Sequence, residues 1–192
     1  VGDEFVGRIR SEQTRIDLPQ MTEPVKNIFV DPRQQWLYVV NGRAQADVFS
    51  LRDKSLNGRY KLLENADAQV TATAQLVGGI SLIVGDSKGG LAQWFMARDT
   101  DGEQRLKQIR TFQMGTTPIV EIAAEERRKG FLALDASGKL GVFHSTAHRT
   151  LLVDQVVEGQ GLFGLSPRAN RVIVEAGGKL QPLLLDNPHP EV

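Results

Sequence analysis

Short apolar segments alternate with polar turns along the whole chain, and the same order of segments recurs four times. Each repeat unit opens with a short apolar segment: VKNIFV (25–30), VTATAQL (70–76), IVEIAA (119–124) and GLFGLS (161–166). After a polar turn comes a run rich in Val, Ile and Leu: WLYVV, ISLIV, FLAL and RVIV. A glycine-containing turn then leads to a third run: ADVFSL, LAQWFM, LGVFHS and LQPLLL. Short β-branched and aromatic runs bounded by Gly, Asn and Asp are typical of strands.

A fourth, more polar segment closes most units: RYKLLE (59–64), QRLKQIRTFQ (104–113) and TLLVDQVV (150–157). The turn glycines that align between the units are Gly42, Gly89, Gly138 and Gly178. Their spacing gives a period of roughly 40–50 residues, which is typical of propeller blades. The pattern therefore predicts an all-β, WD40-like propeller array of about four four-stranded antiparallel blades. We expect a buried second strand and an exposed, polar fourth strand in each blade.

The predicted units cover residues 20–64, 65–113, 114–157 and 158–186 within one domain, 1–192. Residues 1–19 contain a spare strand-like segment, DEFVGRIRSEQTRIDLP (3–19), which we expect to act as an extra outer strand. Within the first unit, Asn41–Gly42 predicts a type I′ turn. A β-sandwich would also give frequent turns, but the similarity of the units favours the propeller. The four units either close into a ring or form part of a larger propeller.

Composition narrows the class of protein further. The 192 residues include 23 basic and 23 acidic side chains, so the formal net charge is zero. This balance argues against a nucleic-acid-binding protein, because such proteins usually carry a basic excess. No apolar run approaches the ~18 residues that a membrane-spanning helix needs, so we expect no membrane insertion by this segment. There is no cysteine. Because Val1 is not an initiator methionine, we expect a piece of a longer protein.

Three motifs have chemical interpretations that their context does not favour. GQGLFG (159–164) matches a dinucleotide-binding pattern, but a strand-like run follows it where a helix is needed. DTDGE (99–103) resembles a fragment of a calcium loop without its distant glutamate, so it is better read as a hairpin turn. His144 and His148 have a zinc-ligand spacing only on a helix, and their surroundings predict strands. We therefore predict no catalytic, metal or cofactor site and no enzymatic activity.

Basic residues recur at or beside the aligned glycine turns. We expect Arg43, Lys88, Lys139 and Lys179 to form a ring on one face of the propeller and to bind an anion or an acidic partner. A second set, at the other turns, would mark the opposite face: Arg33, Arg127, Arg128, Lys129 and Arg168. The alternative is that Lys, Arg, Asn and Gly are simply common in exposed turns.

Long stretches of the chain resemble a known family. They are RIDLPQMTEPVKNIFVDPRQQWLYVVNGRAQADVFSLRDKSLNGRYKLLE, LVGGISLIVGDSKGGLAQWFMARD and ALDASGKLGVFHSTAHRTLLVDQVV. These stretches resemble the large extracytoplasmic insertion of the long-form, Pst-type phosphate ABC transporter permease. The resemblance implies a WD40-like periplasmic domain of an inner-membrane protein. It supplies no site residue, because the parts that conduct phosphate and couple to the ATPase lie outside this chain.

By this resemblance the domain has an accessory or regulatory role in phosphate import, since short permeases of the class lack the insertion. Its implied partners are the periplasmic phosphate-binding protein, the rest of the permease and the ATP-binding subunits. The first hypothesis is therefore a docking module. The alternatives are an anion-sensing, ligand-binding domain, or a structural spacer with no binding role.

Overall fold

The computed structural model describes residues 23–126, 129–165 and 171–184, and within these ranges it contains strands and turns but no helix. The first sheet is formed by β1 (Val25–Val30), β2 (Trp36–Asn41), β3 (Gln45–Ser50) and β4 (Ser55–Lys61). The second contains β5 (Val70–Gln75), β6 (Ser81–Asp86), β7 (Gly90–Arg98) and β8 (Gln104–Gln113). The third contains β9 (Ile119–Glu125), β10 (Gly130–Asp135), β11 (Lys139–His144) and β12 (Arg149–Gln155). The fourth contains β13 (Leu162–Leu165), β14 (Arg171–Ala176) and β15 (Lys179–Leu184).

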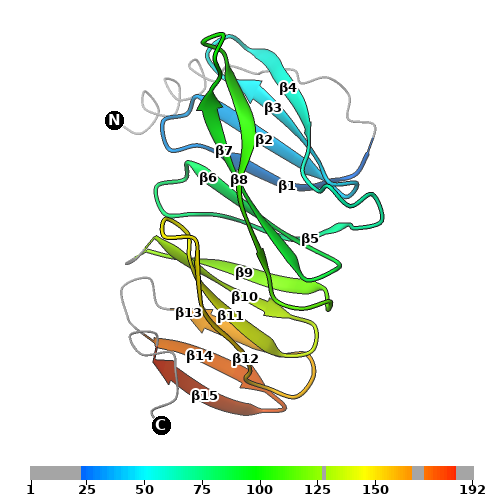
Figure 1. Cartoon of the computed structure of the whole chain (residues 1–192), viewed down its shortest axis with the longest axis vertical. Coiled ribbons are helices and arrows are strands. Elements are labelled where there is room, and N and C mark those ends of the chain that lie inside the picture. The colour runs from blue at the N-terminus through cyan, green and yellow to red at the C-terminus, as the bar shows by residue number, and fades with distance from the viewer. Residues whose placement is uncertain (1–22, 127–128, 166–170, 185–192) are drawn as a thin grey trace, which may run out of the picture.

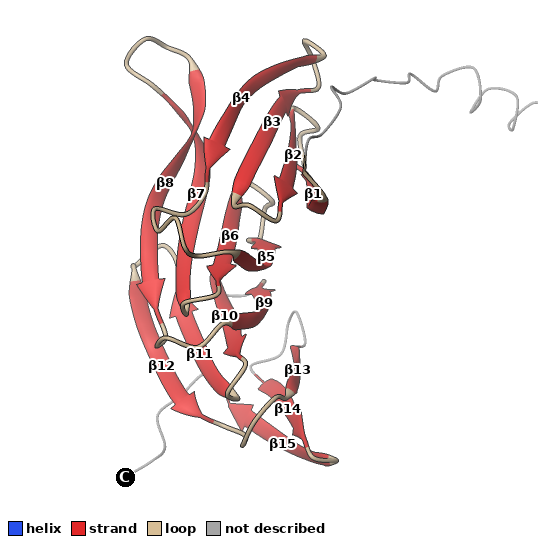
Figure 2. Ribbon diagram, turned by 90° about the vertical axis from the view of Figure 1, so that its right-hand side faces the viewer, coloured by secondary structure: helices blue, strands red, loops and turns tan. Residues whose placement is uncertain are grey.

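Each sheet is an antiparallel meander in which strands pair in chain order. The sheets stack one after another along the long axis of the molecule (Figure 1). In the side view the stack is an arc, with β1, β5, β9 and β13 along its inner side and β4, β8 and β12 along its outer side (Figure 2). The described residues therefore form an open series of propeller blades.

The second strand of each four-stranded sheet is largely buried, and in the two middle sheets this strand, β6 or β10, contributes side chains to a core on each face. In β10, Phe131 and Ala133 lie in the core shared with the second sheet. Leu132 and Leu134 lie in the core shared with the fourth sheet. Successive side chains of a strand point to opposite faces, so an uninterrupted apolar run serves two cores at once. The outer strands β4 and β12 are largely exposed, as the polar composition of the fourth segments predicts.

The fourth sheet departs from the prediction of four four-stranded blades, because it has three strands in the part of the chain that the structure describes. The predicted extra strand at 3–19 lies outside the described residues, as do Arg127, Arg128 and Arg168. One face of the fourth sheet points away from the third sheet. Leu162 and Leu180 lie on this face and are exposed.

The prediction of a type I′ turn at Asn41–Gly42 is wrong. In the turn between β2 and β3 it is Ala44, with a φ of 60°, that adopts the left-handed conformation. Gly89 and Gly138 take this conformation in the next two sheets, with φ of 76° and 87°. Ala44, not Gly42, is therefore the structural counterpart of these glycines.

Candidate interaction surface

The turns that connect the second and third strands of the sheets share one design in the first three sheets. A side-chain oxygen at the end of the second strand accepts two backbone N–H groups of the turn. The acceptors are the side-chain oxygens of Asn41, Asp86 and Asp135, and all six bonds measure 2.7–3.0 Å. The donors are the backbone N–H groups of Arg43 and Gln45 in the first sheet, Lys88 and Gly90 in the second, and Ser137 and Lys139 in the third. Asn and Asp favour such turns because their side chains imitate a backbone acceptor. We call the edge formed by these turns and the β14–β15 turn the Asx edge.

Glutamine side chains fasten the Asx edge to the connections between sheets. The amide of Gln113, at the end of β8, donates to the carbonyl of Lys88 at 2.9 Å and to that of Gly115. Gln155, at the end of β12, donates in the same way to the carbonyls of Ser137 and Val157. The β6–β7 and β10–β11 turns are thus each tied to the loop that leads into the next sheet. The Asx edge is a rigid surface made of loops, which is where binding is most often found.

The four predicted basic residues all lie on the Asx edge, but not at equivalent positions. Arg43 and Lys88 are the second residues of their turns, whereas Lys139 and Lys179 are the first residues of the strands that follow. Arg43, Lys88 and Lys179 are exposed and Lys139 is half-buried. The Arg43 side chain, 76% exposed, pairs with Glu23 at 3.1 Å. Three sheets therefore present an exposed cation on this edge.

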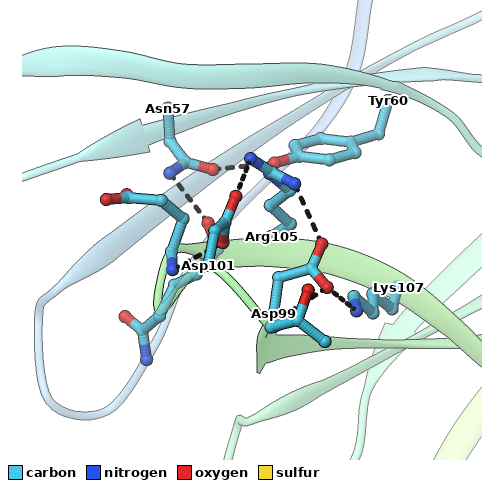
Figure 3. A network of polar contacts seen from close by, with 9 residues as sticks. Asn57, Tyr60, Asp99, Asp101, Arg105 and Lys107 are labelled. Atoms are coloured by element: carbon cyan, nitrogen blue, oxygen red, sulfur yellow. Dashed lines mark hydrogen bonds and ion pairs between the residues drawn. The ribbon is translucent and has the colours of Figure 1, made fainter.

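The remaining turns form the opposite edge of the arc, and Arg33 and Lys129 lie there. The DTDGE segment is the β7–β8 turn on this edge, and Gly102 in it has a φ of 86°. Arg105 bridges Asp99 and Asp101 at 2.9 and 2.6 Å, and Lys107 contacts Asp99 at 3.0 Å (Figure 3). These cations lower the pKa of Asp99, Lys107 most of all. Both aspartates of this turn are ion-paired within the hairpin, which supports the interpretation of the segment as a hairpin turn.

The two histidines that share a zinc spacing each have a local structural contact. His144 Nδ1 accepts the N–H of Ala147 at 3.1 Å. His148 Nε2 lies 2.9 Å from the carbonyl oxygen of Thr111, and its ring meets Phe112 edge-on. Within the described ranges no group of three or more His, Asp or Glu side chains is arranged to hold a metal. The GQGLFG segment leads from a turn into β13, as its context predicts.

A hollow of about 240 Å³ opens on the inner side of the arc between β1, β5 and β9. Lys26 Nζ donates to the carbonyl of Val70 at 2.9 Å, and Asn27 Nδ2 donates to Thr73 Oγ1 at 2.9 Å. Both donors keep further hydrogens for a ligand. Glu121 lines the same hollow, and burial raises the pKa of its carboxyl, although a hydrogen bond from the Phe163 N–H works against this. The sequence offered no sign of this hollow, since its residues come from three separate sheets.

The repeated sheets, their stacking and their buried second strands define an all-β propeller fold of the WD40 kind. Two solved structures share this fold with a TM-score of 0.63 each. One is the beta-propeller domain of Cps50 (Swd1) from Myceliophteria thermophila, 10% identical over 85% of this chain and 49% of that one. The other is the WD40 domain of SCAP from fission yeast, 14% identical over 88% of this chain and 44% of that one. The chain thus spans about half the length of these structures.

At these identities the likeness establishes the fold alone. No protein-family model and no curated protein matches the sequence. In the part of the chain that the structure describes, no helix has the length and apolar character needed to cross a membrane.

Proposed function

We propose that this chain is a non-enzymatic interaction module, part of a WD40-like propeller that faces the periplasm from a phosphate ABC transporter permease of the inner membrane. The observation that carries the proposal is the Asx edge, a rigid loop surface with exposed Arg43, Lys88 and Lys179. Such a surface suits a broad protein partner better than a small substrate. The sequence resemblance to the permease insertion supports the location and the transport role.

The proposed partner is the phosphate-loaded periplasmic binding protein, which the module would hold near the permease and its ATP-binding subunits. Biolayer interferometry of the chain against that binding protein, with and without phosphate and at two salt concentrations, tests this. We expect saturable binding that phosphate strengthens and salt weakens, because exposed charges are screened by salt. Absence of binding in every condition contradicts the docking role and favours a structural spacer.

The basic residues of the Asx edge are tested by replacing Arg43, Lys88, Lys139 and Lys179 together with Gln. We expect association with the binding protein to slow about tenfold or more at low salt, since charge complementarity acts mainly on the association rate. Thermal stability should change little, because exposed ion pairs contribute little. The matched control is Lys54→Gln with Lys129→Gln, two exposed cations on the opposite edge. Equal association rates for the variant and the control would remove the basic residues from the docking surface.

The inner hollow supports a second candidate function, anion sensing by the domain itself. Lys26 and Asn27 supply converging donors there, which a small-ligand site requires. Isothermal titration with inorganic phosphate distinguishes the two functions. Saturable heat that is lost in Lys26→Gln would favour sensing, whereas no heat leaves docking as the function to be tested by interferometry.

A further inference from the structure

A small pocket of about 190 Å³, with apolar walls and a polar rim, lies on the opposite edge, where the first and second sheets meet. Its apolar walls come from β2, the β5–β6 turn and β7: Trp36, Tyr38, Ile80, Phe95 and Met96. Its polar lining comes from the β1–β2 turn and β8: Asp31, Arg33, Gln35 and Gln104. The pocket is smaller than a typical site for a whole drug-sized ligand. It has the size to receive one large apolar side chain of a partner.

Both turns that frame the pocket are fixed before any partner arrives. The buried carboxylate of Asp31 accepts the backbone N–H groups of Arg33, Gln35 and Trp36 at 3.1, 2.6 and 2.7 Å. The β5–β6 turn lies so close that a Cβ on Gly79 would come within 2.5 Å of the Pro32 ring. Binding would therefore cost little ordering of the loops, which favours affinity.

The apolar walls include side chains that water still reaches. Ile80 is 50% exposed and Trp36 is half-buried, although both are large and apolar. Tyr38 is buried, and burial together with the nearby Asp31 charge raises the pKa of its phenol, so this wall stays neutral. Trp, Tyr and Arg are the residues that most often dominate binding energy in protein interfaces.

The charge at the rim is set by Arg33. Its exposed guanidinium makes no ion pair within the described residues, whereas the Asp31 carboxylate is already occupied by its own turn. A carboxylate placed at the rim would therefore find an exposed partner in Arg33, whereas the Asp31 carboxylate is buried and holds its own turn. Charge complementarity favours an acidic partner segment at this rim.

We propose that this pocket docks a peptide segment in which a large apolar side chain, seated between Trp36 and Ile80, lies next to a carboxylate that pairs with Arg33. The site lies on the edge opposite the Asx edge. The proposal therefore does not depend on the proposed partner or on the basic residues of the Asx edge.

The test is an NMR titration of the ¹⁵N-labelled chain with N-acetyl-L-leucine, which joins an apolar side chain to a carboxylate. The two tryptophan indole signals serve as probes, because Trp36 lines the pocket while Trp94 is buried in the core. The indole signal that disappears in the Trp36→Phe variant belongs to Trp36, and the remaining signal belongs to Trp94. We expect a saturable shift of the Trp36 signal alone, about two- to fivefold weaker affinity for the uncharged N-acetyl-L-leucinamide, and no shift with acetate.

Variants separate the two parts of the site. Arg33→Gln should reduce the affinity for N-acetyl-L-leucine to that of the amide, and Ile80→Ser should weaken both ligands. Val77→Ser, in the same turn but outside the lining, and Lys54→Gln, on the same edge, are the matched controls and should change neither. No shift of the Trp36 signal up to the solubility limit, or equal shifts of both indoles, would overturn the proposal. Equal affinities for acid and amide would overturn the role of Arg33.

Discussion

At the scale of single residues, Glu121 is an ionisable group placed where burial disfavours its charge. It lines the inner hollow, and its pKa is raised above that of the unfolded chain, where a Glu titrates near about 4.3. A raised pKa means that the folded state binds the proton more tightly than the unfolded state. The stability from this group is therefore fully present below the unfolded pKa and is lost as the pH rises through the folded pKa.

Glu121→Gln should consequently make the protein more stable than the parent at pH 7 and leave it unchanged at pH 4 or below. The amide imitates the protonated carboxyl and still accepts a hydrogen bond from the Phe163 N–H. Urea denaturation at both pH values measures the difference. Glu103→Gln, at an exposed position in the β7–β8 turn, is the control and should have no effect at either pH. A parent as stable as Glu121→Gln at pH 7 would contradict the assignment.

At the scale of elements, the hairpin turns depend on two separable features, backbone conformation and close packing. Gly89 and Gly102 both have positive φ, 76° and 86°. A Cβ on Gly89 would lie 2.6 Å from the carbonyl oxygen of Gly115, in the connection to the next sheet, whereas one on Gly102 would meet nothing within 4 Å. The β6–β7 turn is thus packed against its neighbour and the β7–β8 turn is open.

Gly102→Ala should therefore cost about 1–2 kcal/mol, the usual cost of a left-handed residue with a Cβ. Gly89→Ala should cost distinctly more, because either the turn or the 114–118 connection must shift. The free energies of unfolding from urea titrations compare the two variants directly. Equal costs would show that the contact with Gly115 relaxes freely.

The turns of the Asx edge also show how much of this candidate surface the sequence predicts. Placing Arg43, Lys88, Lys139 and Lys179 beside turns needed only the strand pattern. The alignment of the turns themselves was wrong in the first unit, because Gly42 was aligned with Gly89, although Ala44 takes the left-handed conformation. The Asn or Asp three residues before that position, at 41, 86 and 135, was the signal that would have given the correct alignment.

At the scale of the whole molecule, the sheets are joined by separate cores, one at each boundary. The boundary between the second and third sheets contains an aromatic cluster in which Phe131 stacks on Phe143 at 4.9 Å and meets Phe112 edge-on at 5.3 Å. A buried polar chain also crosses it, since Ser145 Oγ donates to Gln93 at 2.9 Å and Gln93 donates to Ser81 at 3.2 Å. In such linear arrays stability is the sum of unit and boundary terms.

Phe131→Ala should remove about 3–5 kcal/mol from the central boundary. We expect the first two sheets and the last two sheets to unfold in separate steps, because the link between them is the weakened one. Val174→Ala, at the boundary with the fourth sheet, should instead loosen only that sheet. Calorimetry together with hydrogen exchange distinguishes these patterns. A single transition for Phe131→Ala, shifted as a whole, would show that the arc unfolds as one unit.

The sequence by itself determined the all-β class, the four-fold repeat and the stacking of blades, because the same order of short apolar runs and polar turns recurs in every unit. It also placed the basic residues near turns. Only the tertiary structure decided that the blades form an open arc and that the turns are held by Asx and Gln side chains. The inner hollow and the pocket at the opposite edge are also tertiary features. Each is lined by residues from different sheets, and packing between the blades brings these residues together.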